Sequence, residues 1–321
     1  MNAAFPETMV KDTLSGIVLT ALICSIAVSI PVIGFFALLL LPQPVILYRL
    51  RLGRRQGLII VGAAMALIVL LAGKTFADAL FLLAMLGLGF FMGEFIERRL
   101  SVEKTIGYAC AAVLAGGLFL LAVYAGSPGT GIREMLSDYI AENLRATITL
   151  YEDTGVPKET ILVFKESIAS ITRAVIGMLP SLAAAGLLFA GWVNLLTARR
   201  LLSRWKPVYA DFGDLNLWKS PDFLVWAVTG TIALLLLPGH TTKLLGLNGL
   251  VVLMMIYFFQ GIAVTSFYFE KKRVPLLLRA MVYVLIAVQQ IFLLLVVAIG
   301  FFDVWANFRR LGSLPPDGAG Q

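Results

Sequence analysis

Residues 244–269 read LLGLNGLVVLMMIYFFQGIAVTSFYF, a run of 26 residues without one charged side chain. A helix rises about 1.5 Å per residue, so about 20 apolar residues cross the roughly 30 Å of hydrocarbon in a lipid bilayer. This run is therefore long enough to span a membrane. Eight further apolar stretches lie at residues 14–30, 32–48, 57–73, 75–95, 105–125, 176–197, 223–237 and 276–302. The sequence predicts an all-α fold, a polytopic transmembrane helical bundle of eight or nine spans embedded in the lipid bilayer.

The composition excludes the soluble classes of protein. Of the 321 residues, 60% are hydrophobic and 14% are charged, whereas a soluble domain carries about 25% charged residues. So few polar side chains cannot cover a water-exposed surface, which excludes a soluble enzyme, a nucleic-acid-binding domain and a disulfide scaffold. We interpret the formal net charge of +7 as the charge that orients a membrane protein, and we expect no nucleic acid as a partner.

Basic residues gather in alternate loops, at residues 49–55, 98–104, 199–219 and 271–279. The long loop at residues 126–175 instead holds five basic and seven acidic residues. Short loops that are rich in Lys and Arg stay in the cytoplasm. We therefore predict that the basic loops are cytoplasmic and that residues 126–175 lie outside.

The number of spans depends on Pro31, where the first two apolar stretches meet without a polar turn. Proline removes a helical hydrogen bond, and either a kink or a complete break is compatible with the sequence. A break gives nine spans, with the N-terminus inside and the C-terminus outside. A kink gives eight spans, with both ends outside.

Residues 126–175 are predicted to form two amphipathic helices. Apolar side chains recur at helical spacing from Ile132 to Ile148, and Gly155-Val156-Pro157 separates this helix from a second one. The helices can lie on the lipid or cover the outer opening of the bundle, and their acidic polar faces favour a cover. The predicted parts of the chain are an N-terminal membrane bundle at 1–125, the outer loop at 126–175, a C-terminal membrane bundle at 176–310 and a flexible tail at 311–321.

The motifs of membrane enzymes are missing from the sequence. A single histidine, His240, rules out a His–His metal site and an HExxH motif. The chain also has neither a GxSxG nucleophile motif nor a GxxxxGK[ST] phosphate-binding loop. We predict that the protein is not an enzyme, that it uses no metal or cofactor, and that it does not itself hydrolyse ATP.

Uncharged amides inside the apolar stretches are the main candidates for a ligand site. Gln260, Gln289 and Gln290 lie in the middle of the last two stretches, and Asn194 lies near the inner end of an earlier one. An unpaired amide in hydrocarbon costs several kcal/mol, so each must bond to another helix, to water or to a ligand. The sequence leaves open whether these amides join helices or bind a ligand.

Two further features are candidates for function. An ionisable group at membrane depth marks a functional site by default, and Glu94 is the strongest example in this chain. It lies about one turn from the end of its stretch, where a pair with Arg98 at i, i+4 would satisfy it locally. Ala21, Ser25 and Ser29 recur every four positions, a pattern typical of close helix contacts and a candidate partner-facing surface.

Four motifs, in this order, resemble the YybS-like family of bacterial predicted membrane proteins. They are Ile30-Pro31 to Leu41-Pro42-Gln43-Pro44 with the basic turn that leads to Gly57, Leu217-Trp218-Lys219-Ser220-Pro221-Asp222-Phe223 with Val225-Trp226, Phe259-Gln260-Gly261-Ile262-Ala263, and the basic turn that follows it. The resemblance covers most of the chain. It implies a multi-pass protein of the bacterial inner membrane without an established activity.

That family is in turn distantly similar to the substrate-binding S-subunits of energy-coupling-factor vitamin transporters. The similarity implies a bundle that captures a small molecule from outside and docks on a membrane or ATPase partner complex, with small residues comparable to Ala21, Ser25 and Ser29 facing the partner. The chain departs from these subunits by three extra spans and a long outer loop.

Two hypotheses follow for the function. The first is a permease-type transport component that binds a small-molecule ligand and has no ATPase of its own. The alternative is a membrane scaffold or regulatory protein that acts through protein partners, with no transported ligand.

Overall fold

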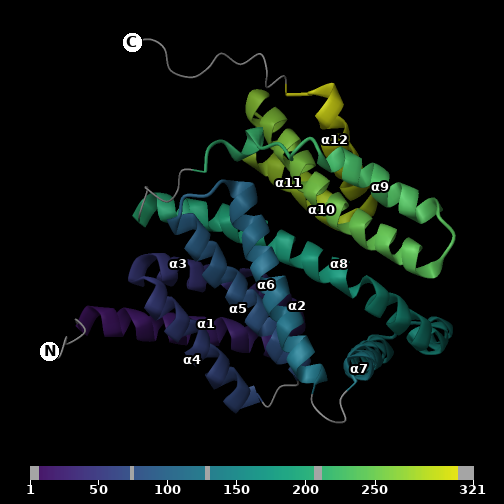
Figure 1. The fold of residues 1–321 in the computed structure, drawn as a ribbon, viewed down its shortest axis with the longest axis horizontal. Coiled ribbons are helices and arrows are strands. Elements are labelled where there is room, and N and C mark those ends of the chain that lie inside the picture. Colours follow the sequence, from purple (N-terminus) through teal and green to yellow (C-terminus); the bar gives the residue numbers. More distant parts are fainter. Residues whose placement is uncertain (1–6, 73–75, 127–130, 206–211, 310–321) are drawn as a thin grey trace. The chain divides into compact units, whose positions relative to one another are not determined.

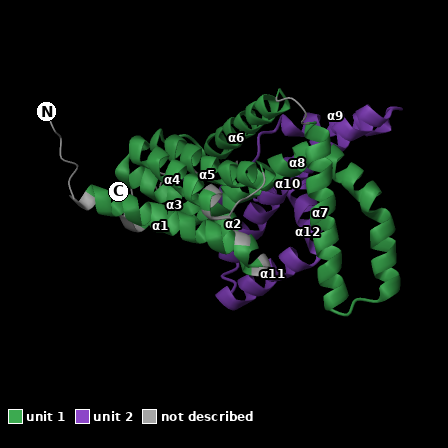
Figure 2. Cartoon of the chain, turned by 90° about the horizontal axis from the view of Figure 1, so that it is seen from below, with its two compact units in different colours: residues 1–211 green, residues 212–321 purple. Residues whose placement is uncertain are grey.

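The computed structural model describes residues 7–72, 76–126, 131–205 and 212–309, and this part of the chain is helical without β-strands (Figure 1). The chain forms two compact units, residues 1–211 and 212–321 (Figure 2). The sixth apolar stretch belongs to the first of these units, and the predicted division of the chain into parts stays a prediction. The predicted tail at 311–321 lies outside the described residues.

The first unit holds the helices α1 (Glu7–Ser29), α2 (Pro31–Leu40), α3 (Pro42–Leu52), α4 (Arg54–Ala72), α5 (Phe76–Glu97), α6 (Val102–Ala125), α7 (Ile132–Asp153) and α8 (Lys158–Trp205). The second unit holds a short 3-10 helix, η2 (Leu215–Leu217), followed by α9 (Leu224–Leu236), α10 (His240–Lys271), α11 (Leu276–Val288) and α12 (Gln290–Ala306).

The chain reverses direction between α1 and α2, so the break at Pro31 is complete. Ile30 has an extended backbone, and Pro31 takes the first position of α2, where its missing N–H does no harm. The two arms then run back along each other, because Gly34 lies against the carbonyl of Ala27 and Ser15 Oγ lies 2.9 Å from Tyr48 Oη. α1 and the α2–α3 pair are therefore separate candidate spans.

Glycines on α5 allow α3 to approach closely. A Cβ added at Gly89 would lie 2.6 Å from the carbonyl oxygen of Pro42, and one at Gly93 would lie 2.7 Å from Cγ of Arg49. At Gly89 the nearest atoms are backbone, so this position requires glycine, whereas a side chain at Gly93 would force the Arg49 side chain to shift. This contact brings the turn after α3 and the turn after α5 to one end of the first unit.

α7 and the beginning of α8 form an antiparallel hairpin. Lys165 Nζ lies 2.7 Å from Glu152 Oε1 near its tip, and Ile148 and Ile161 are buried. α8 runs over 48 residues with Pro180 inside it, and its first part, beside α7, points in a different direction from the rest (Figure 2). The second predicted helix of the loop is therefore the first part of the sixth apolar helix. α7 packs mainly against α8, and its side of the membrane stays a prediction.

In the second unit, α9 and α10 form a hairpin, and α12 packs on α10. A side chain at Gly261 would collide with the carbonyl of Val296, and one at Gly300 would collide with the carbonyl of Tyr257. These two glycines let the backbones of α10 and α12 touch. The small residue in the Phe259-Gln260-Gly261 motif is thus explained by helix packing.

The last predicted span, 276–302, is not one straight helix. It is divided at Gln289 into α11 and α12, whose axes bend by 102°. Near the C-terminal end of α10, Arg279 donates from Nη2 to the carbonyl oxygen of Phe269 at 3.1 Å, and Tyr268 donates to that of Phe308 at 2.9 Å. The start of α11 and the end of α12 therefore lie at the same end of α10, and Gln289 is the apex between them.

Within the described residues, six helices are long and apolar enough to span a membrane, or seven when α11 and α12 count as one. The predicted count of eight or nine is not confirmed. The stretch at 223–237 falls short because α9 has 13 residues, or about 20 Å. The stretch at 57–73 reaches residues 73–75, which lie outside the described part of the chain.

Candidate functional site

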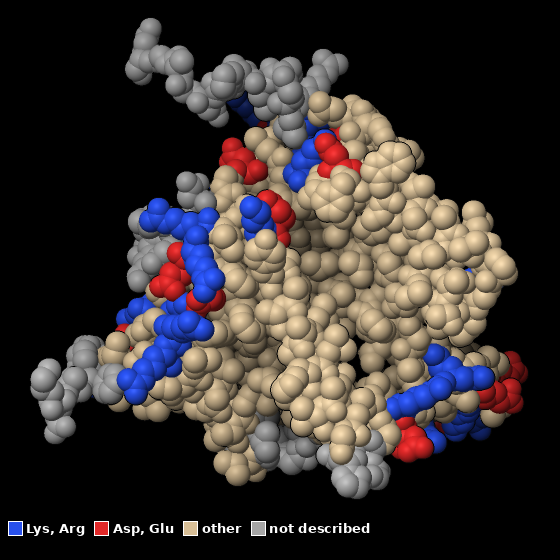
Figure 3. Space-filling view, viewed as in Figure 1, with Lys and Arg blue, Asp and Glu red and all other residues tan. Residues whose placement is uncertain are grey.

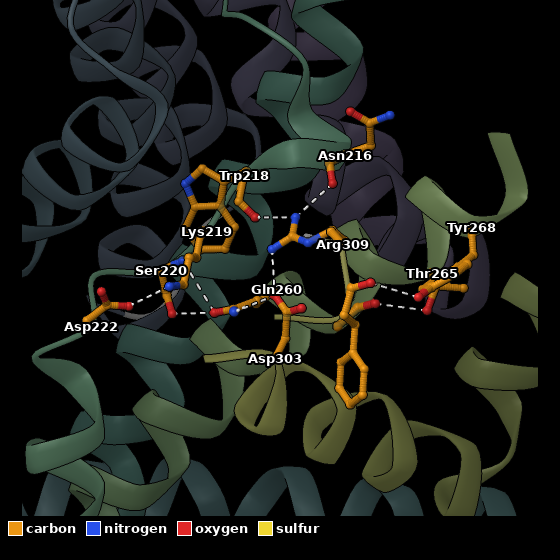
Figure 4. Close-up of polar contacts among 12 residues, drawn as sticks. Asn216, Trp218, Lys219, Ser220, Asp222, Gln260, Thr265, Tyr268, Asp303 and Arg309 are labelled. Carbon is orange, nitrogen blue, oxygen red and sulfur yellow. Dashed lines mark hydrogen bonds and ion pairs between the residues drawn. The ribbon is translucent and has the colours of Figure 1, made fainter. Parts of the chain in front are cut away.

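The second unit contains a buried polar cluster, which we name the Gln260 cluster and define as Ser220, Gln260, Asp303 and Arg309 (Figure 4). Ser220 lies just before α9, Gln260 lies on α10, Asp303 lies on α12, and Arg309 follows α12. The cluster therefore joins α10 and α12 to the segments before α9 and after α12. The close approach of α10 and α12 at Gly261 and Gly300 brings its members together.

Gln260 is fully engaged by protein groups at both ends of its amide. Its Oε1 accepts from the backbone N–H of Ser220 at 3.3 Å and from the Ser220 hydroxyl. Its Nε2 donates to Asp303 Oδ2 at 3.1 Å. An amide bonded in this way stabilises the contact between helices.

Asp303 and Arg309 form a buried ion pair, with 2% and 3% of their surfaces exposed. Arg309 Nη2 lies 2.7 Å from Asp303 Oδ2. Arg309 Nη1 donates to the carbonyl oxygens of Asn216 at 2.8 Å and Trp218 at 2.9 Å. The pair thus fixes the segment after α12 to the segment before α9, and each charge depends on the other because neither reaches water.

Asn194 is engaged in the first unit. Its Nδ2 donates to the carbonyl oxygens of Leu39 at 2.7 Å and Ala190 at 2.8 Å. With its amide nitrogen turned towards acceptors, Gln43 donates to O and Oδ1 of Asn194 at 3.1 and 3.2 Å. The Asn194 amide therefore bonds a backbone carbonyl group at the break between α2 and α3, where Pro42 interrupts the hydrogen bonds of the helix.

Glu94 belongs to a charged cluster at the end of α5. Its Oε2 lies 2.5 Å from Nη2 of Arg49, whose side chain is 1% exposed, and its Oε1 lies 2.9 Å from Arg98 Nη2. The same nitrogen of Arg49 bonds to Glu97 at 2.6 Å. The predicted ion pair between Glu94 and Arg98 is present. The more deeply buried partner of Glu94 is Arg49, which lies on α3.

Gln289 and Gln290 are apart from the other predicted site residues. Gln289 has an extended backbone between α11 and α12, Gln290 is the first residue of α12, and both are exposed. Neither side chain makes a hydrogen bond to another residue that the structure describes. The structure places no member of the Gln260 cluster at this apex.

The small residues of α1 do not form one uniform surface. Ala21 is buried, whereas Ser25 and Ser29 are exposed. The Ser25 hydroxyl donates to the carbonyl oxygen of Ala21 at 2.9 Å, which satisfies it within its own helix. Ser25 and Ser29 can meet a partner, and Ala21 cannot without movement of the unit.

A hydrogen bond joins α7 to α5. Tyr139 Oη donates to Asp78 Oδ1 at 2.8 Å. Burial of the Tyr139 ring and its bond to the Asp78 carboxylate raise the pKa of this phenol to about 12. The phenol therefore stays protonated and continues to donate over the physiological range of pH.

Sequence reasoning missed Arg49, Ser220, Asp303, Arg309 and Gln43 as members of polar clusters. Their signal is a polar residue inside or just beside an apolar stretch, and Gln43 also lies between two prolines. What the sequence lacks is the identity of each partner, because the bonded residues lie up to 155 positions apart. Within the described residues, no three His, Cys, Asp or Glu side chains are grouped as metal ligands.

Comparisons with known proteins agree with the resemblance to the YybS-like family and do not show the similarity to transporter S-subunits. Residues 18–304 match the family described as "Predicted membrane protein (DUF2232)". The chain is 25% identical over 299 residues to "Uncharacterized protein YybS" of Bacillus subtilis (strain 168), an alignment that covers 91% of this chain and 94% of that protein. No solved structure matches the chain. The chain therefore belongs to the DUF2232 family of predicted membrane proteins.

Proposed function

We propose that this protein is an integral membrane scaffold or regulatory component that acts through protein partners. The supporting observation is that the amides buried at membrane depth, Gln260 and Asn194, are bonded by protein groups. Amides held open for a ligand would lack such partners. These residues, together with Glu94 and its arginines, serve to join helices in this reading.

The α7–α8 hairpin is the surface that best fits a partner. α8 holds 48 residues, about twice the number that crosses the hydrocarbon of a bilayer, and its first part turns away from the rest of the helix together with α7 (Figure 2). Close to the hairpin tip, Leu162 and Val163 are 57% and 63% exposed, beside charged Glu152 and Lys165. Exposed apolar side chains rimmed by charges are typical of protein contact sites.

Affinity purification with quantitative mass spectrometry tests this function. We expect the wild type to retain a stoichiometric protein partner and L162E/V163E to lose it at least about tenfold, because two charges would be buried at the contact. The matched control is A169E/S170E, which puts the same two charges on exposed positions of the same helix. Equal recovery from all three proteins would refute the hairpin as the docking surface.

A permease-type role is the second candidate, and one observation favours it. Interrupted helices line the substrate sites of many transporters, and the break between α11 and α12 carries Gln289 and Gln290. A ligand at this break would raise the thermal unfolding temperature of the wild type in a metabolite screen and leave Q289L/Q290L unchanged. If the protein also resembles transporter S-subunits in function, it would dock on a partner complex that contains an ATPase.

A further inference from the structure

The first turn of α4 carries positive charge where a helix favours negative charge. It reads Arg54-Arg55-Gln56-Gly57 and contains no acidic residue. The N–H groups at the start of a helix have no partner within the helix, and the helix dipole makes this end positive. Gly53, with a φ of 94°, precedes the turn, and glycine has no side chain that could cap these N–H groups. An anion at this turn would neutralise the arginines and accept from the N–H groups.

A buried arginine lies against the same turn, and two of its nitrogens lack an acceptor. The side chain of Arg49 on α3 is 1% exposed, and a Cβ added at Gly57 would lie 2.9 Å from its Cδ. Its Nε, which is bonded to that Cδ, therefore lies beside the first turn of α4. Nη2 bonds to Glu94 and Glu97, whereas Nε and Nη1 have no hydrogen-bond partner in the described part of the chain. A buried charged donor without an acceptor is costly, so an oxygen ligand at these nitrogens is expected.

The charges around Arg49 do not balance without a further anion. Arg98 Nη2 lies 2.9 Å from Glu94 Oε1. Arg54 Nε lies 3.8 Å from Glu94 Oε2, which is too far for a hydrogen bond. Three guanidinium groups therefore share the carboxylates of Glu94 and Glu97, which leaves positive charge in excess. All of these residues belong to the first unit.

Neither an aromatic ring nor water accounts for the whole arrangement. The centroid of the Phe90 ring lies 5.9 Å from Cζ of Arg49, which stabilises the charge but offers no oxygen to Nε and Nη1. A water molecule can accept from these nitrogens, yet it leaves the excess of positive charge at the start of α4 uncompensated. A phosphate group supplies both the acceptor oxygens and the missing negative charge.

We propose that a phosphate group binds at the first turn of α4, held by the backbone N–H groups of that turn and by Arg49, Arg54 and Arg98. Guanidinium groups pair with phosphate through parallel N–H bonds. The turns at 49–55 and 98–104 are among the basic loops predicted to face the cytoplasm, where anionic phospholipids present their headgroups. The phosphate belongs either to such a lipid or to a soluble compound, and the two sources are separated below. This site goes beyond the proposed function, because it does not involve the α7–α8 hairpin.

Thermal unfolding of the detergent-purified protein tests the lipid as the source. Micelles that contain phosphatidylglycerol should raise the unfolding temperature relative to micelles with zwitterionic phosphatidylcholine. We expect R54Q/R98Q to need at least about tenfold more phosphatidylglycerol for the same shift, because two charged contacts are lost. The matched control is R133Q/R145Q, which removes the same charge from α7 and should respond like the wild type. Scans without added lipid verify that all three proteins fold.

Sodium phosphate, compared with sodium chloride at equal ionic strength, tests a soluble compound as the source. A shift with sodium phosphate alone that R54Q/R98Q loses and R133Q/R145Q keeps assigns the site to a soluble phosphate compound. The same pattern with phosphatidylglycerol assigns it to a lipid headgroup, and a response to both probes supports a site for the phosphate group itself.

Three results overturn the proposal. The first is a wild type that neither probe stabilises. The second is a shift that R54Q/R98Q retains in full, because the arginines would then not hold the phosphate. The third is a shift that R133Q/R145Q loses to the same extent, since the response would then reflect the overall charge of the protein.

Discussion

At the scale of single residues, the polar groups of this protein are explained by where their partners lie. Sequence reasoning recognised that Gln260, Asn194 and Glu94 each need a partner, because hydrocarbon offers none. It identified only Arg98, which is four residues from Glu94. The remaining partners come from other helices, and a sequence without tertiary contacts does not specify them.

The Asp303–Arg309 pair gives the sharpest prediction at this scale. D303A leaves a buried guanidinium without its counter-charge, and we expect it to lower the free energy of unfolding by about 3–5 kcal/mol. D303N/R309M removes both charges and should recover part of this loss. Thermal unfolding in detergent measures both variants. Equal stability of D303A and wild type would show that Asp303 and Arg309 do not form an ion pair in the membrane.

Glu94 and Glu97 form a natural matched pair, since both bond to the same nitrogen of Arg49. The side chain of Glu94 is 12% exposed and that of Glu97 is 45% exposed. We expect E94Q to lower the free energy of unfolding by about 1–3 kcal/mol and E97Q by less than about 1 kcal/mol. The reverse order in a denaturation series would contradict the role of burial.

At the scale of elements, close helix contacts depend on a few glycines. The collision expected at Gly261 predicts that G261A separates α10 from α12 and lowers the free energy of unfolding by about 1–3 kcal/mol. Gly230 on α9 has open space around its Cβ position, so G230A should be neutral or stabilise by up to about 1 kcal/mol. Denaturation of the two variants under one condition compares them directly, and equal losses would refute the tight contact.

The Tyr139–Asp78 bond predicts how α7 responds to pH. The pKa of Tyr139 is raised from 10.0 to about 12 in the folded protein, so its contribution to stability is complete below pH 10 and is lost as the pH rises towards 12. The wild type should therefore lose stability between pH 10 and 12, relative to Y139F. Thermal scans across this range measure the difference, and parallel curves for the two proteins would exclude the effect.

The Gly155-Val156-Pro157 break was predicted, and it separates α7 from α8 in the structure. At Pro31 the sequence left a kink and a break open, and the structure has a break. The break at Gln289 was not predicted, because its apolar neighbours on both sides look like one continuous helix. Its cause is tertiary, since α11 and α12 both return to the C-terminal end of α10.

At the scale of the molecule, each unit has a recognisable basic end. Asp12 on α1 lies 2.9 Å from Arg51, so in the first unit the beginning of α1 lies at the end that carries the basic turns. In the second unit, the segment after α12 lies beside the turn at residues 271–273. Figure 3 shows charged side chains gathered in groups, whereas most of the surface in view is uncharged.

These positions predict the membrane topology. If basic turns are cytoplasmic, both termini face the cytoplasm, which differs from either arrangement expected from the sequence. Green fluorescent protein fused to each end should fluoresce, and alkaline phosphatase fused to the C-terminus should be inactive. An active phosphatase fusion would place the C-terminus outside the cytoplasm, as expected if residues 276–302 cross the membrane once.

The sequence by itself determined that this is a helical multi-pass membrane protein, since long uncharged apolar runs have no stable alternative to a helix in a bilayer. It also determined the family, through motifs spread along most of the chain. Only the tertiary structure decided that the last apolar run returns to the end where it began, and which distant side chains satisfy each buried polar group. The physical reason is that hydrophobicity acts on every residue locally, whereas a hydrogen bond between helices depends on two residues that meet only after folding.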